Sequence, residues 1–307
     1  MRFAISIPQH VADGAFDPAA MRGYLARAEE IGFASAWTQE QVLGTSPALG
    51  PVETLTYAAA CTDRIRLGCA VFITTLHSPV HLAKSLSTLD QLSLGRLEVG
   101  VGTGGAHRMF SAFGVDRKSF VARFNEGLRL MRALWTEPTV NFEGRFWQLN
   151  DAAMEPKPFQ KPGPPVWFGG SHPAALGRAA RHGDGFFGAG SNSTEQFAKQ
   201  VQIVRAELAD QGRDAAAFPI AKRVYIAVDD DGERARERMR AALGQLYGFV
   251  SPGRDMTPVS VCGTPDACVR GLQDVADAGA ELILLNPLFD DQEQMERLAA
   301  EVVPQLS

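Results

Sequence analysis

Short apolar segments alternate with longer amphipathic segments along the whole chain. The apolar segments predict β-strands near residues 3–8, 34–39, 66–73, 97–101, 165–168, 185–188, 223–228 and 281–286. The last of these is the clearest, because residues 282–285 are all leucine or isoleucine. A strand that is apolar throughout is typical of a parallel sheet, which is covered on both faces.

The amphipathic segments predict α-helices near residues 18–31, 52–62, 79–93, 118–135, 173–182, 194–211, 231–246, 265–278 and 291–303. In the third of these, Leu82, Leu86 and Leu89 fall on one face of the helix. Pro79 stands in its first turn and Gly95 follows its end, and proline and glycine commonly mark helix ends in this way.

Eight predicted strands that alternate with helices indicate a parallel α/β fold. Eight strands also close a (β/α)8 TIM barrel, and 307 residues suffice for one with insertions in the loops of its C-terminal face. A doubly wound open sheet is the competing fold. Because we find no linker, no repeat of fixed period and no low-complexity segment, we expect a single domain over residues 1–307.

Two segments have the character of insertions. Residues 138–150 alternate between apolar and polar around Gly144, which predicts a small hairpin. Residues 247–261 contain Gly248, Pro252, Gly253 and Pro258. This composition indicates an irregular loop, placed where it can lie over the opening of an active site.

The composition is that of an ordinary globular protein, with 45% hydrophobic and 21% charged residues. A formal net charge of −5 without a basic cluster argues against nucleic acid and anionic membranes as partners. The N-terminus shows no signal-peptide pattern, no apolar run is long enough to span a bilayer, and the four cysteines form no Cys-x-x-Cys pair. We therefore expect a cytoplasmic protein with free thiols.

One strand-to-helix junction carries the strongest chemical signal. The apolar residues 165–168 end in Gly169, Gly170 and Ser171, and Pro173 opens the next predicted helix. Glycines at a helix start bring several backbone N–H groups around one point, which is a site for an anion, most often a phosphate. The alternative is a tight turn that needs glycine for its backbone alone.

Other motifs are weaker. Residues 100–105 match G-x-G-x-x-G, but no helical pattern begins at the third glycine, so we reject a dinucleotide-binding fingerprint. His77 and His81 are four residues apart, but Pro79 lies between them and no glutamate follows His77, so we expect no metal site. Glu40 is a lone carboxylate at a strand end, either a surface or capping residue or an acid–base group.

Several segments together resemble the luciferase-like monooxygenase superfamily, in the branch of coenzyme F420-dependent oxidoreductases. They cover essentially the whole chain in the order of the family, and they are residues 31–37, 66–79, 89–104, 113–115, 134–135, 155–158, 166–170 and 183–185. The resemblance implies a TIM barrel that binds coenzyme F420, or alternatively FMN, at the carboxyl ends of its strands.

The resemblance also implies roles for particular residues. Ala70 and Val71 would be joined by a cis peptide bond in a bulge of the third strand, which supports the middle ring of the flavin. Thr103 and Gly104 would contact the polar edge of the ring. The cofactor phosphate would lie at Gly169, Gly170 and Ser171, in agreement with the anion site inferred from the junction itself.

One departure from the family matters. The family commonly has Asp-His after the tryptophan of the second strand, and here the two positions are Glu40 and Gln41. Glutamine cannot donate or take a proton at neutral pH. Either Glu40 does the acid–base work with Gln41 orienting a ligand, or another group such as His10 does, or the chemistry is pure hydride transfer. His10 and Trp37 are the predicted substrate-binding residues.

The first functional hypothesis is an oxidoreductase that transfers a hydride between coenzyme F420 and a small organic substrate, with the chemistry supplied by the cofactor. The alternative is an FMN-dependent two-component monooxygenase that uses O2. A separate flavin or F420 reductase would then be a partner. A third hypothesis is a non-catalytic flavin-binding barrel. We also expect the protein to form a homodimer.

Overall fold

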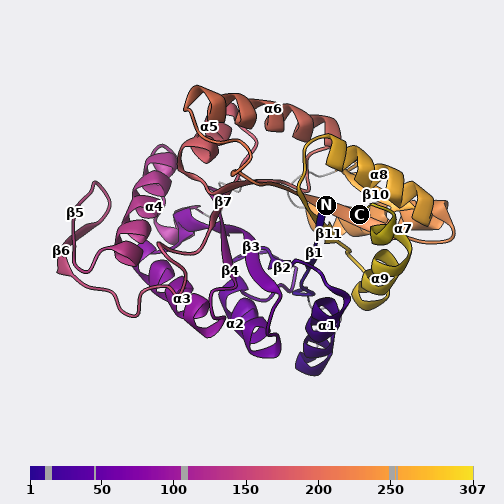
Figure 1. Ribbon diagram of the computed structural model, residues 1–307, viewed down its shortest axis with the longest axis horizontal. Helices are drawn as coiled ribbons and strands as arrows, with labels where there is room; N and C mark the ends of the chain where they lie inside the picture. The colour runs from indigo at the N-terminus through magenta and orange to yellow at the C-terminus, as the bar shows by residue number, and fades with distance from the viewer. Residues whose placement is uncertain (11–15, 45, 105–109, 249–252, 254, 307) are drawn as a thin grey trace.

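Eight parallel strands close into a ring in the computed structural model, and helices surround the ring (Figure 1). The structure describes residues 1–10, 16–44, 46–104, 110–248, 253 and 255–306. The ring runs through β1 (Arg2–Ser6), β2 (Ser35–Thr38), β3 (Arg66–Ile73), β4 (Leu97–Gly102), β7 (Val166–Gly169), β8 (Gly185–Gly188), β9 (Ile220–Val228) and β11 (Leu282–Asn286). Pairing of β11 with both β9 and β1 closes it. The predicted TIM barrel is confirmed, and the open sheet is excluded.

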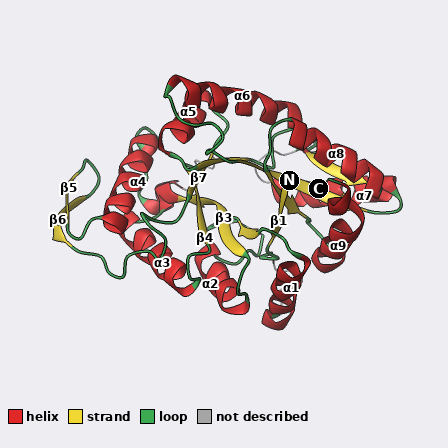
Figure 2. Ribbon diagram, in the orientation of Figure 1, coloured by secondary structure: helices red, strands yellow, loops and turns green. Residues whose placement is uncertain are grey.

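The helices lie outside the ring, as the secondary-structure colours of Figure 2 show. They are α1 (Pro18–Ile31), α2 (Pro51–Cys61), α3 (Pro79–Leu92), α4 (Phe120–Thr136), α5 (Pro173–His182), α6 (Thr194–Asp210), α7 (Gly232–Tyr247), α8 (Pro265–Asp277) and α9 (Asp291–Arg297). The predicted helix 291–303 is α-helical only to Arg297, and it continues as a π-helical turn (Leu298–Val302). Several helices begin with proline, whose missing N–H costs nothing there.

Two apolar layers hold the barrel together. The larger layer lies between the outer faces of the strands and the helices. The smaller layer fills the barrel interior, where the rings of Trp37, Trp167 and Phe187 pack edge to face with centroids 4.8 to 6.2 Å apart. The two indole N–H groups donate to Ser35 and Glu98, at 2.7 and 2.6 Å. The barrel is therefore a packed core, and a ligand can enter only beyond the carboxyl ends of its strands.

The predicted hairpin insertion is confirmed. Strands β5 (Val140–Glu143) and β6 (Gln148–Ala152) pair antiparallel and project from the barrel beside α4 (Figure 1). The Glu126 carboxylate on α4 accepts the backbone N–H groups of residues 145–147 at 2.8 to 3.1 Å, so it fixes the turn of the hairpin.

A further element differs from the sequence prediction. Residues 260–261, expected to be irregular loop, belong to a strand, β10 (Ser260–Gly263), that pairs with the distal half of β9. The loop prediction was wrong at this end, because a strand of four residues with serine and glycine at its ends has no pattern of its own and depends on its neighbour. Residues 249–252 and 254 of the same predicted loop lie outside the described residues.

No helix in the described ranges has the length and apolar character needed to cross a membrane. All four cysteines are free thiols, as predicted. Complete burial raises the pKa of the Cys69 thiol well above its ordinary value, and burial also raises that of Cys268, to about 12. These two side chains therefore act as small apolar groups in the core.

Candidate active site

All seven residues predicted to bind the cofactor line one cavity of about 910 Å³ at the carboxyl ends of the strands. We call it the glycine-lined cavity. Its wall contains Ala70, Val71, Gly102, Thr103, Gly104, Gly169, Gly170, Ser171, Arg178, Gly188, Gly190, Arg223, Tyr225 and Tyr247, among others. Residues from strands far apart in the sequence meet here because parallel strands of a barrel all end on the same face.

Two glycines at the end of β7 are required by close packing. A Cβ on Gly169 would lie 2.8 Å from Val71 Cγ1, and a Cβ on Gly170 would lie 2.8 Å from the Cβ of Ala175 in the first turn of α5. Both distances are shorter than real Cβ contacts. The glycines therefore let the backbone pass close to β3 and α5, and they leave the start of α5 open toward the cavity.

The N-terminus of α5 has the features of an anion site. His172 caps the helix, with its Nδ1 accepting the N–H of Ala174 at 3.2 Å. Arg178, one turn further on, also lines the cavity. Burial and the charge of Arg181 lower the pKa of Arg178, so a nearby anion would relieve an unfavourable field. Helix start, glycine backbone and guanidinium together can hold a phosphate.

The loop after β8 borders the same site and is anchored from outside the barrel. Lys222 on β9 is buried, and its Nζ donates to the carbonyls of Ala189 and Asn192 at 2.6 and 2.9 Å. Asn192 Nδ2 in turn donates to Ser171 Oγ at 3.0 Å. Burial, with the charge of neighbouring Arg223, lowers the pKa of Lys222 to about 7. The residues that follow β7 and β8 are thus joined in one hydrogen-bonded unit.

The other end of the cavity lies over β3 and β4. The predicted cis peptide bond between Ala70 and Val71 is confirmed. Val71 and Thr103 lie in the wall together, and the carbonyl of Thr103 accepts the hydroxyl of Thr75 at 2.9 Å. The cavity therefore runs from the ends of β3 and β4 to the start of α5. An extended molecule with a flat ring at one end and a phosphate at the other fits its donors and its close backbone walls.

The structure places Glu40 and Gln41 beside the site. Glu40 is almost fully buried, with Oε1 2.7 Å from His77 Nε2 and Oε2 accepting the N–H of Ile73 at 2.5 Å. Gln41 donates to the carbonyl of Ser46 at 3.3 Å. The described walls of the cavities include neither Glu40 nor Gln41. A buried carboxylate therefore orients a partly exposed histidine that sequence reasoning had set aside.

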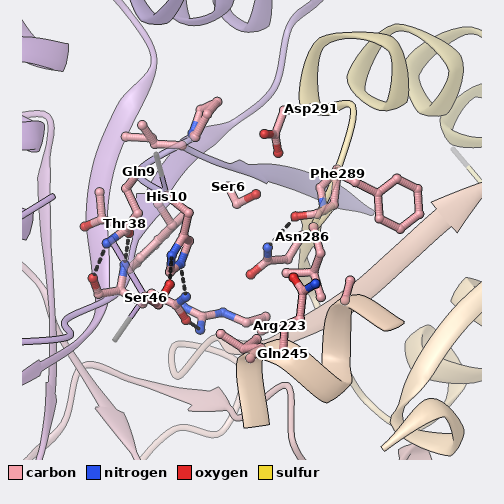
Figure 3. A pocket seen from close by; sticks show the side chains of 18 of the residues that line it. Ser6, Gln9, His10, Thr38, Ser46, Arg223, Gln245, Asn286, Phe289 and Asp291 are labelled. Atoms are coloured by element: carbon pink, nitrogen blue, oxygen red, sulfur yellow. Dashed lines mark hydrogen bonds between the residues drawn. The ribbon is translucent and has the colours of Figure 1, made fainter. Parts of the chain in front are cut away.

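A second cavity, of about 610 Å³, adjoins the first, and we call it the mouth cavity (Figure 3). The predicted substrate-binding residues His10 and Trp37 both lie in its wall. Gln39 and Arg223 belong to the walls of both cavities and separate them.

A chain of hydrogen bonds runs along this boundary (Figure 3). Arg223 donates to Gln39 Oε1 at 2.5 Å, Gln39 Nε2 lies 3.0 Å from His10 Nε2, and His10 Nδ1 lies 3.1 Å from Ser46 Oγ. Since the amide nitrogen of Gln39 can only donate, His10 Nε2 carries no proton and Nδ1–H donates to Ser46. Burial and the charge of Arg223 lower the pKa of His10, which also favours this neutral form.

Sequence reasoning missed Arg178, Arg223, Tyr225 and Tyr247, which all line the glycine-lined cavity. The hydroxyl groups of the two tyrosines lie 2.8 Å apart in the wall of the glycine-lined cavity. Burial and the neighbouring Tyr225 raise the pKa of Tyr247, so the Tyr247 hydroxyl stays protonated. The available signal was spacing: Arg223 and Tyr225 alternate with apolar residues in a predicted strand and therefore face the same side.

The comparisons with known proteins agree on one family. A model of the family described as "Luciferase-like monooxygenase" matches residues 1–257. The chain is 26% identical to an F420-dependent glucose-6-phosphate dehydrogenase of Amycolatopsis mediterranei, over 95% of each chain. It is 32% identical to an FMNH(2)-dependent dimethylsulfone monooxygenase of Pseudomonas putida, over 73% of this chain and 61% of the relative. Among solved structures, monooxygenase RslO1 from Streptomyces bottropensis superposes with a TM-score of 0.88 at 28% identity, covering all of both chains.

Proposed function

The chain belongs to the luciferase-like monooxygenase family, and from this membership we propose that it transfers a hydride between coenzyme F420 and a small organic substrate. As a member of the family it is an oxidoreductase that depends on a flavin or on F420. The observation that carries the proposal is the glycine-lined cavity, whose wall brings the β7–α5 junction and the ends of β3 and β4 together. Glycines and a helix start at one end suit a phosphate, and close backbone walls at the other suit a ring.

We choose F420 over FMN because the F420-dependent relative aligns with more of this chain than the FMNH(2)-dependent relative does. The F420-dependent relative aligns over 95% of both chains, whereas the FMNH(2)-dependent relative aligns over 73% of this chain. Glutamine at position 41, in place of the family's usual histidine, also suits a reaction whose main step is hydride transfer.

A second candidate is an FMN-dependent monooxygenase that takes reduced flavin from a separate reductase and uses O2. It is favoured by the higher identity to the FMNH(2)-dependent relative, 32% against 26%, and by the similarity to RslO1 over the whole chain. Both candidates use the same cavity, because the two cofactors share the tricyclic ring and the ribityl phosphate that these walls would hold.

The bound cofactor would supply the hydride, and the residues of this chain would bind, orient and shield it. Gly169, Gly170 and Ser171 would hold the phosphate by backbone N–H groups, with Arg178 adding charge. Val71 and Thr103 would position the ring. The aromatic layer inside the barrel keeps water from reaching the site from below, which strengthens every polar interaction in it.

We propose that the Glu40–His77 pair handles the proton that accompanies hydride transfer. The buried carboxylate holds Nε2 of His77 at 2.7 Å, and the imidazole is partly exposed, so it can exchange a proton with solvent. The competing role is purely structural: Glu40 also accepts the N–H of Ile73 and so joins the end of β3 to β2.

Binding and oxygen uptake decide between the two cofactors. Purified apoprotein is titrated with F420 and with FMN, followed by cofactor fluorescence, and each reduced cofactor is then offered with a panel of ketones and aldehydes. We expect tighter binding of F420 and reoxidation of reduced F420 without O2 uptake. Substrate-dependent O2 consumption with FMNH2, and none of the F420 reactions, would replace the first proposal with the second.

A further inference from the structure

The guanidinium of Arg223 is buried between the two cavities, and it has no counterion among the residues that the structure describes. Arg223 is 8% exposed and belongs to both cavity walls. Of its five N–H donors, two have acceptors among the described residues, namely Gln39 Oε1 and the Ala70 carbonyl, both at 2.5 Å, and its Nε has none. No described carboxylate forms an ion pair with it. A buried charge is costly unless a partner of opposite sign compensates it.

The carboxylates of Glu40, Asp290 and Asp291 do not serve as that partner. Asp290, in the wall of the mouth cavity, pairs with Arg238 at 2.5 Å. Both oxygens of Glu40 are engaged by His77 and by the N–H of Ile73. Asp291 lies across the mouth cavity from Arg223 (Figure 3), where burial and the charge of Asp290 raise its pKa to about 6. The positive field of Arg223 is instead felt by His10, whose pKa it helps to lower.

The mouth cavity combines this cation with an apolar wall. Pro47, Leu288 and Phe289 line one part of it, and Ser6 and Asn286 add a hydroxyl and an amide. Its volume of about 610 Å³ suits a small organic molecule. A ligand that fits has an apolar body and one negatively charged group with oxygen acceptors.

We propose that the mouth cavity selects a carboxylic acid as substrate, with the carboxylate paired to Arg223 and the apolar body against Leu288 and Phe289. The carboxylate supplies the missing counterion and acceptors for free N–H groups of the guanidinium. Because Arg223 also borders the glycine-lined cavity, the bound acid would lie next to the cofactor. That the acid is a substrate rests on the proposed function, whereas its binding does not.

The test compares acids with neutral amides of the same shape. The protein, loaded with the cofactor that it binds, is titrated calorimetrically with 1-naphthoate and 1-naphthamide, and with 4-phenylbutyrate and 4-phenylbutanamide. A charge-assisted pair in a buried site predicts that at least one acid binds about tenfold more tightly than its amide. Arg223→Met should remove this preference, and Arg223→Lys, which keeps the charge, should restore part of it.

Arg64→Met is the matched control. Arg64 is exposed and precedes β3 at the opposite end of the barrel, so the substitution removes one positive charge and should keep the acid preference. Circular dichroism checks that each variant is folded. If Arg223→Met does not fold, Arg223→Lys and the acid-to-amide ratio of the unaltered protein decide.

Equal affinity for acid and amide, no binding by either acid, or an acid preference that survives in Arg223→Met would overturn the proposal. Its failure is distinguishable from failure of the proposed function. An acid preference without turnover of reduced F420 or FMNH2 overturns the proposed function and leaves the acid site standing. Turnover of neutral substrates without any acid preference overturns the acid site and leaves the proposed function standing.

Discussion

Asp291 is a partly buried carboxylate at the start of a helix. It stands at the first position of α9, in the walls of the mouth cavity and of a neighbouring cavity between α1 and α9. Burial, with the adjacent charge of Asp290, raises its pKa from 3.8 to about 6. Such a group lowers the stability of the folded protein wherever the unfolded chain would be ionised and the folded one resists ionisation.

We therefore expect Asp291→Asn to stabilise the protein above about pH 4. At about pH 3 the carboxyl is largely protonated in both states, so the substitution should change the stability little. Between about pH 4 and pH 6 the unfolded chain ionises while the folded carboxyl resists ionisation, so the folded state becomes progressively disfavoured. The stability gained by the substitution should reach about 1–3 kcal/mol near pH 6 and stay at that level at pH 8. Chemical denaturation at pH 3 and pH 8 measures it. Glu237→Gln, an exposed change of the same charge, is the control, and an equal gain at both pH values would contradict the prediction.

The Glu40–His77 pair gives the second prediction for single residues. Because Glu40 holds His77 and the amide of Gln cannot take up a proton, Glu40→Gln should lower turnover about 100-fold or more, with cofactor affinity little changed. Gln41→Ala should mainly raise KM. Steady-state kinetics across pH provides the measurement. Near-wild-type turnover with an unaltered pH profile in Glu40→Gln would leave the carboxylate with its structural role at the end of β3.

At the scale of elements, the junction between β7 and α5 carries the cofactor hypothesis. The sequence alone predicts α5 with the bounds that the structure shows, because a proline opens the helix and a strand ending in two glycines precedes it. The anion-binding interpretation needed no tertiary information, since the donors belong to neighbouring positions of the chain.

Gly170→Asp should abolish binding of F420 and FMN without unfolding the barrel. The new side chain would crowd Ala175, because a Cβ at position 170 would lie 2.8 Å from the Cβ of Ala175, and its charge would repel a phosphate. Fluorescence titration measures affinity, and circular dichroism measures the fold. Gly244→Asp on α7, where a Cβ would have no neighbour within 4 Å, is the matched control. Unchanged affinity in Gly170→Asp would place the phosphate elsewhere.

Other parts of the site could not be predicted from local pattern. The contacts of Arg223 with Gln39 and with the carbonyl of Ala70 span 184 and 153 positions of the chain, and they exist only because the ring closes. The alternation of residues in the strand predicts that Arg223 faces the barrel interior, but it does not predict which groups its guanidinium contacts there. The pairing of Glu40 with His77 is hidden for the same reason, since it joins loops that follow two different strands.

At the scale of the whole molecule, closure of the ring depends on its last strand. Strand β11 pairs with β1 through Arg2–Leu282 to Ile5–Leu285 and with β9 on its other side. The family match ends at residue 257, before β10 and β11. We propose that residues 1–307 form one domain. A chain that lacks β10 and β11 would then have two open sheet edges, and its interior apolar layer would be exposed.

A chain truncated after residue 257 should therefore lose cooperative unfolding and associate through its exposed edges. Thermal melts followed by circular dichroism and size-exclusion chromatography measure both properties. A chain ending at Gln305 retains every barrel strand and should behave as the full protein does. A monomeric, cooperatively unfolding 1–257 fragment would show that the C-terminal strands are dispensable and that the single-domain proposal is wrong.

Two adjacent cations on β9 have a consequence for how the chain finds its fold. Arg223 faces inward to Gln39 on the β2 side and Ala70 on β3, while Lys222 faces outward to the carbonyls of Ala189 and Asn192. A slip of β9 by one residue would exchange the two faces, sending the guanidinium under α6 and the ammonium into the barrel mouth. The short lysine head and the forked arginine head cannot satisfy each other's partners. This dipeptide therefore favours one register of the seventh barrel strand over its one-residue neighbours.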